Sequence, residues 1–225
     1  MPRGSGGRRK APKATRRTVF VWCEGETEKV WLTGLKEALN EGEGGARLDK
    51  PNIKIRDATG SDATTRLDAA ESEREDNAAA REDCYLVMDT EAHVPELLTK
   101  LNRVLDAKPG VTLVLSHLCF EVWLHRLLPE PMACNKDTAD ACRVSLKREW
   151  KKQNVNGRPY HKTSDRLYED TADQLEDTLG RHHGEHRAAG PVAHETPAFT
   201  EVPTLVRVLR SLYGEDSPEP KGPKG

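Results

Sequence analysis

Residues 18–39, TVFVWCEGETEKVWLTGLKEAL, contain the pattern that decides the fold class. Residues 18–23 form an unbroken apolar run of strand length, which predicts a strand buried on both faces. Glu24 and Gly25 end this run, and a helix is expected after Thr27 because apolar residues recur there at helical spacing. The apolar face of that helix consists of Val30, Trp31, Leu35, Ala38 and Leu39. The stretch therefore predicts a strand, a sharp turn and an amphipathic helix.

The same pattern recurs along the chain. Residues 84–88 (CYLVM) and 111–115 (VTLVL) are two further apolar runs, and each precedes a segment with helical spacing, at 95–105 and 120–128. Residues 52–56 (NIKIR) alternate in polarity and are short, which suits an edge strand. Buried strands that alternate with amphipathic helices are typical of an α/β fold, with a parallel sheet flanked by helices on both sides.

The composition changes along the 225 residues, a length that suits one full domain with appendages or two small ones. We expect a basic disordered arm at 1–16, the α/β core at 17–128, a helical extension at 129–213 and a disordered tail at 214–225. Helices are predicted in the extension at 138–151, 165–180 and 203–213. Residues 61–82 are polar and rich in alanine, and they suit either a solvated helix or a mobile excursion.

The charge of the chain is unevenly distributed. Residues 1–17 hold seven Lys and Arg and no acid, so the remaining 28 basic and 37 acidic residues give that part a net charge of −9. The arm could contact phosphates or could be a solvated tail. The acidic body as a whole is not typical of a general nucleic-acid binder.

Other features exclude several classes of protein. No apolar run approaches the roughly 18 residues of a membrane helix, and the charged amino terminus lacks the apolar run of a secretory signal. The five cysteines include no close CxxC pair, which predicts free thiols in a reducing cytoplasm. The chain lacks a Walker GK[ST] loop and a GxGxxG motif, which argues against ATP hydrolysis or NAD binding.

Acidic residues follow two of the predicted strands. Glu24 ends the first strand, while Asp89 and Glu91 end the strand at 84–88. Because parallel strands end at the same edge of a sheet, we expect these carboxylates to converge there, beside Ser116 and His117. Such oxygen ligands suit Mg²⁺ or Mn²⁺, which can activate water for phosphodiester cleavage. Each acid could instead be a helix cap or a solvated loop residue.

Histidines and cysteines raise a separate possibility of zinc. His182, His183 and His186 are closely spaced, but Gly184 interrupts any helix there and favours a polar solvated loop. Cys134 and Cys142 could join histidines in a metal site. The simpler interpretation is apolar packing for Cys142 and a loop thiol at Cys134. We expect Cys23, Cys84, Cys119, Trp123 and His125 to belong to buried segments.

Three blocks of sequence resemble the RloB-like family. They are VFVWCEGETEKVWLTGLKEAL at 19–39, YLVMDTEAH at 85–93 and SHLCFEVWLHRL at 116–127. In that family an apolar strand leads into an EG-x-TE segment, a second strand ends in D-x-D, and a SNPCFE-x-W-x-L-x-H segment follows. The blocks occur here in that order, but Glu91 replaces the commoner Asp, and His117 stands where Asn is usual.

The resemblance implies a Toprim-like core with a divalent-metal site. By matching position, Glu24 would be a general acid or base and a metal ligand, and Asp89 and Glu91 would be metal ligands. Glu28 and Glu121 match further family positions, where they could bind metal or form an ion pair or cap.

The function implied is that of a Mg²⁺- or Mn²⁺-dependent nuclease. It would cleave DNA or RNA and work with an AAA/ABC-type ATPase encoded nearby in bacterial defence against phage. A non-catalytic binding or scaffold subunit of such a complex is the main alternative. A different α/β enzyme, such as a phosphohydrolase or methyltransferase, is a third.

Overall fold

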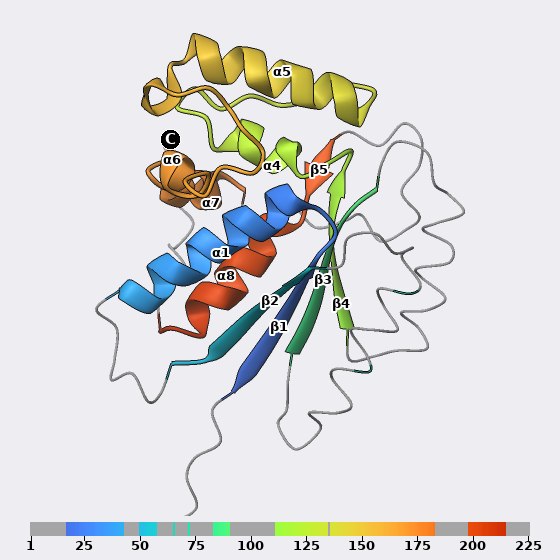
Figure 1. Cartoon of the computed structure of the whole chain (residues 1–225), viewed down its shortest axis with the longest axis vertical. Coiled ribbons are helices and arrows are strands. Elements are labelled where there is room, and N and C mark those ends of the chain that lie inside the picture. Colours follow the sequence, from blue (N-terminus) through green and yellow to red (C-terminus); the bar gives the residue numbers. More distant parts are fainter. Residues whose placement is uncertain are drawn as a thin grey trace, which may run out of the picture.

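Five strands form one sheet in a computed structural model of the chain, which describes residues 17–42, 50–57, 65, 72, 83–90, 111–134, 136–182 and 198–214 (Figure 1). The strands are β1 (Thr18–Cys23), β2 (Asn52–Asp57), β3 (Asp83–Asp89), β4 (Val111–His117) and β5 (Phe199–Thr200), in the order β2-β1-β3-β4-β5. The first four are parallel, and β5 pairs antiparallel with β4. The predicted α/β class is confirmed, and β2 is the edge strand that its alternating sequence indicated.

Helices pack on and around this sheet. They are α1 (Glu26–Glu41), α4 (Glu121–Arg126), α5 (Ala139–Lys152), α6 (Glu169–Ala172), α7 (Leu175–Arg181) and α8 (Val202–Ser211), with a 3-10 turn η1 at Val155–Gly157. In Figure 1, α1 and α8 lie together on one face of the sheet. The expected helix at 95–105, the arm at 1–16, the tail from 215 and nearly all of 61–82 lie outside the described residues.

The single helix predicted at 165–180 is wrong, because two short helices, α6 and α7, occupy that segment. Thr171 supplies a physical reason. Its hydroxyl donates to the carbonyl oxygens of Leu167 and Tyr168, and it accepts a 2.9 Å hydrogen bond from Trp31 Nε1. A threonine side chain that bonds to the carbonyl oxygens of the preceding turn in this way bends and slightly weakens a helix, and the break follows at Asp173 and Gln174.

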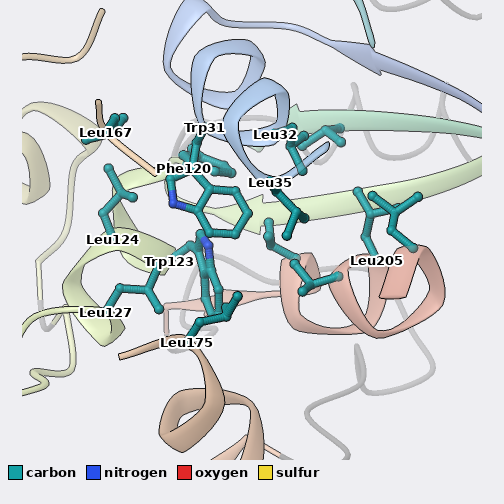
Figure 2. Packing of buried hydrophobic residues seen from close by; sticks show 14 of the residues in the cluster. Trp31, Leu32, Leu35, Phe120, Trp123, Leu124, Leu127, Leu167, Leu175 and Leu205 are labelled. Carbon is teal, nitrogen blue, oxygen red and sulfur yellow. The ribbon is translucent and has the colours of Figure 1, made fainter. Parts of the chain in front are cut away.

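Strands β1, β3 and β4 are largely buried on both faces, as their unbroken apolar sequences predicted, whereas the edge strand β2 is only partly buried. Val19 and Val21 of β1 face the main core beneath α1 and α8, whereas Phe20 lies in a second cluster on the opposite face. In the main core Trp31 of α1 meets Trp123 of α4 edge to face, with ring centroids 5.7 Å apart (Figure 2). This contact fixes the start of α4 against α1, and both helices contribute to the site described below.

The carboxyl-terminal segment joins the same core. Phe199 and Thr200 form β5, a strand that the sequence did not predict, and Val202 and Leu205 of α8 are buried in the main cluster. No described helix combines the length and apolar character that a membrane span would need.

Candidate functional site

A cleft of about 520 Å³ opens where β1 and β3 end. Its lining includes six acidic residues, and four of them belong to the predicted site. Glu24 follows β1, Asp89 is the last residue of β3, and Glu28 and Glu121 lie in the first turns of α1 and α4. The structure therefore brings together four of the five predicted site residues. Glu91, the fifth, lies outside the described residues.

Glu24 and Asp89 are joined directly across the two strands. The backbone N–H of Glu24 donates to the carbonyl oxygen of Val87 at 3.1 Å, which extends the pairing of β1 with β3. The side chain of Glu24 then accepts a 3.2 Å hydrogen bond from the backbone N–H of Asp89. The parallel register alone is sufficient to place these two carboxylates at one edge.

Gly25 allows Glu28 to fold back over the turn. A Cβ atom at Gly25 would collide with the Glu28 carboxylate, so any other residue would push that side chain away. Glu28 is only 3% exposed. Burial, together with the charges of Glu121 and Glu24, raises the pKa of Glu28 from 4.5 to about 7. The Glu-Gly pair thus positions a carboxylate that readily holds a proton in the absence of a cation.

Asp89 has an unsatisfied oxygen in the cleft. Its Oδ1 is buried and has no hydrogen-bond partner among the described residues. Burial raises the pKa of Asp89 well above its ordinary value, and the nearby charge of Glu28 adds to this effect. A buried carboxylate oxygen without a partner is costly, and a cation would remove that cost.

Arg143 supplies a positive charge beside two of the carboxylates. From α5, its Nε lies 3.4 Å from Glu121 and its Nη2 lies 3.7 Å from Asp89. The carboxylate of Glu121 also accepts a 3.3 Å hydrogen bond from the hydroxyl of Tyr160. Burial and the charge of Glu121 raise the pKa of this tyrosine, so it remains a donor. Arg143 therefore offsets part of the acidic charge in this structure.

Other cations line the outer part of the cleft. Lys147 lies one helical turn after Arg143 on α5, and Lys162 lies in the segment after η1; both are exposed. Neither makes an ion pair among the described residues. No sequence pattern pointed to these residues or to Tyr160 as part of the site. The spacing of Arg143 and Lys147 places them on one helix face, but nothing in the sequence indicated that this face would cover the carboxylates.

The donor set suits a hard divalent cation. Carboxylate oxygens are the ligands that Mg²⁺ and Mn²⁺ prefer, and the unpartnered Oδ1 of Asp89 is an available donor. Arg143 lies within 4 Å of two of the four carboxylates, those of Glu121 and Asp89, and among the described residues no three of the four reach the spacing of a metal site. Metal binding at this cleft would therefore require the guanidinium to give way.

Other predicted features have different surroundings. His117 is not among the described residues that line the cleft; its Nδ1 lies 2.6 Å from Thr90 Oγ1 and its ring stacks on Phe199. Trp123 is fully buried, as expected. His182 contacts Arg126 at 3.3 Å, while its neighbours His183 and His186 lie outside the described residues.

All five cysteines are buried, and none forms a disulfide in this structure. Cys134 does lie in a loop between α4 and α5, but it is buried.

The comparisons with known proteins bear on the whole of this architecture. The family model described as RloB-like protein matches residues 19–209, a range that includes every residue that lines the cleft. Curated proteins and solved structures gave no match. The matched region covers most of the 225 residues, and the chain therefore belongs to the RloB-like family.

Proposed function

We propose that this protein is a metal-dependent nuclease of the Toprim type. The observation that carries the proposal is the acidic cleft itself. Its six acidic lining residues include four from two adjacent strand ends and two helix starts, and one oxygen of Asp89 has no partner among the residues that the structure describes. The parallel sheet, with its acids at the carboxyl ends of β1 and β3, supports the Toprim assignment.

The residues divide naturally between two tasks. Asp89, Glu28 and Glu121 would hold a Mg²⁺ or Mn²⁺ ion, with Glu91 as a further ligand. Such an ion, when bound, supplies Lewis-acid activation of water and neutralises charge on a phosphate. Glu24 would accept the proton of the attacking water as general base, since its carboxylate is held by the backbone of Asp89.

Charge on the opposite side of the cleft supports a phosphodiester substrate. The lining of this one cleft includes basic residues as well as the carboxylates, namely Arg143, Lys147 and Lys162. On substrate binding, the guanidinium of Arg143 would exchange its carboxylate partners for a phosphate oxygen. This exchange would also leave the carboxylates free to hold the cation.

The resemblance to the RloB-like family supports a further proposal about the wider setting. We propose that the chain acts in the cytoplasm with an AAA/ABC-type ATPase encoded nearby, as the effector of a bacterial defence system against phage. Nucleic acid, either DNA or RNA, is the proposed substrate. The basic residues at 1–17 would add an electrostatic contact with phosphates.

The test is cleavage of labelled single-stranded DNA, duplex DNA and RNA by the purified chain, alone and with the neighbouring ATPase, in Mg²⁺ or Mn²⁺. We expect cutting that Asp89→Asn and Glu24→Gln each abolish. Asp165→Asn, which changes an exposed acid outside the cleft, serves as the matched control and should cut normally. Absence of cleavage under all these conditions would refute the nuclease proposal.

One observation favours a second candidate, a non-catalytic subunit of such a complex. Arg143 already pairs with Glu121 and Asp89, so the cleft could be a self-neutralised structural feature. This candidate predicts stable binding to the ATPase and no thermal shift with Mn²⁺. A Mn²⁺-dependent shift that Asp89→Asn removes would exclude it.

A further inference from the structure

A second group of metal-ligating side chains lies apart from the acidic cleft. His125, Cys134 and Cys142 each offer one ligand atom, and these atoms all lie within 4.8 Å of one another. All three residues are buried. Ligand atoms in a tetrahedral zinc site with Zn–S bonds of about 2.3 Å are separated by roughly 3.8 Å. The three ligand atoms would therefore need to move only slightly closer together to coordinate one ion.

Cys119 adds a fourth donor. Its thiol donates to the carbonyl oxygen of Ala139 at the start of α5 at 3.9 Å, and Cys119 packs with Cys134 and Cys142 in one small buried cluster. Three cysteines and one histidine form a donor set that is typical of structural zinc sites. The sequence hides this set, because its members are spread over residues 119–142 without a CxxC pair.

His125 makes the hydrogen bonds that are typical of a metal-binding histidine. Its Nε2 lies 3.2 Å from the carbonyl oxygen of Cys142, and since a carbonyl can only accept, this nitrogen carries the proton. The other nitrogen, Nδ1, is buried without a hydrogen-bond partner among the described residues. Metal-binding histidines commonly donate one N–H to a backbone carbonyl and direct the other nitrogen at the metal.

We propose that Cys119, His125, Cys134 and Cys142 bind a structural zinc ion. Binding forms three Zn–S bonds and one Zn–N bond, and the three thiol protons pass to solvent. Ordinary apolar packing leaves Nδ1 of His125 unsatisfied, and a disulfide would use only two of the three sulfurs. Zinc provides a partner for all four groups.

The position of this site gives it a definite consequence. Cys119 lies two residues before Glu121, and Cys142 lies next to Arg143. A zinc ion would join the start of α4 to α5, the helix that carries Arg143 and Lys147 over the cleft. Its role is to position α5, and its existence does not depend on the proposed nuclease activity.

The test begins with the full chain, purified without chelator and analysed by mass spectrometry for metals. We expect about one zinc per chain. After exchange with Co²⁺, thiolate charge-transfer and tetrahedral d–d absorption bands should appear. Cys134→Ser and Cys142→Ser should lose most of the zinc and these bands. Cys23→Ser and Cys84→Ser remove buried cysteines outside the cluster and should retain both.

The wild-type chain also gives a measurement that does not rely on variants folding. A mercurial thiol reagent should release the zinc stoichiometrically to a colorimetric chelator. Purified protein without zinc, and without Co²⁺ bands after reconstitution, would overturn the proposal. A disulfide between any two of the three cysteines in freshly purified protein would overturn it as well.

Discussion

The carboxylate of Glu24 accepts a hydrogen bond from the backbone N–H of Asp89, with an N···Oε2 distance of 3.2 Å. This bond joins the ends of two neighbouring parallel strands through the residues that we propose as general base and metal ligand. The amide oxygen of glutamine could accept the same bond, whereas alanine could not. The structural and chemical roles of Glu24 can therefore be separated by substitution.

We expect Glu24→Gln to leave the free energy of unfolding nearly unchanged, because the hydrogen bond is kept. Glu24→Ala should lower it by about 1 kcal/mol, the usual loss for one hydrogen bond. Both variants should weaken Mn²⁺ binding about tenfold or more, since both remove a charge near the ion. Urea unfolding and Mn²⁺ titration by calorimetry measure the two effects, and Glu37→Gln on the exposed side of α1 is the control. Unchanged Mn²⁺ affinity in both variants would argue against the proposed site.

The raised pKa of Glu28 predicts a pH-dependent stability of the metal-free protein. Its pKa is about 7 in the folded protein against 4.5 as its ordinary value, so the folded state holds the extra proton between these two pH values. The free energy of unfolding should therefore fall as pH rises from about 4.5 to 7, by about 3 kcal/mol for this group, and stay level above.

Urea unfolding at pH 5 and pH 8 in chelator-treated buffer checks this dependence. Glu28→Gln should reduce the difference between the two pH values, because the amide does not titrate. Saturating Mn²⁺ should restore stability selectively at pH 8, where the carboxylate is charged and can bind the ion. An equal pH dependence in wild type and Glu28→Gln would contradict the assignment.

Sequence patterns were sufficient for the four parallel strands of the sheet and for placing two of the candidate site residues, Glu24 and Asp89, at its edge. Unbroken apolar runs indicate strands that are buried on both faces of a parallel sheet. Because parallel strands end at the same edge, Glu24 and Asp89, which follow two such strands, are expected to lie close together. Glu28 and Glu121 could be identified as candidate site residues only through the resemblance to a family, because a carboxylate in the first turn of a helix is common and does not by itself indicate a site.

The remaining features depend on tertiary packing that no local pattern encodes. Arg143 reaches the carboxylates because buried residues such as Leu146 and Trp150 fix the orientation of α5. Strand β5 has only two residues, and it is defined by its antiparallel pairing with β4 and not by a pattern of its own. The Cys and His cluster draws on the turn after β4, on α4, on the loop before α5 and on α5 itself, so its members have no diagnostic spacing.

Gly25→Ala should damage the cleft by a purely steric route. The added Cβ would collide with the Glu28 carboxylate, which must then move away from its buried position. We expect a loss of about 1–3 kcal/mol in unfolding free energy, together with weaker Mn²⁺ binding.

Gly180→Ala is the matched control for this substitution. Gly180 lies within α7, and a Cβ there would meet no atom within 4 Å. Alanine should therefore stabilise that helix by up to about 1 kcal/mol without affecting Mn²⁺. If both substitutions changed stability in the same direction, the close approach of Gly25 to Glu28 would not be the cause.

Arg143→Gln should have opposite effects on stability and on Mn²⁺ affinity. The guanidinium lies within 4 Å of both Glu121 and Asp89, so its removal leaves their charges to repel each other. We expect the metal-free variant to lose about 1–3 kcal/mol of stability, as the buried carboxylates lose their partner. Mn²⁺ should then bind more tightly, because it no longer competes with an internal cation for the same oxygens.

Thermal shift against Mn²⁺ concentration measures both quantities in one series. Arg166→Gln removes an exposed arginine that pairs with Glu169 at 3.0 Å, and it should change neither quantity by much. If Arg143→Gln instead weakened Mn²⁺ binding, the guanidinium would be holding the carboxylates in a metal-binding arrangement rather than competing for them. The direction of this one change therefore decides whether the ion pair seen in the cleft opposes or prepares the proposed metal site.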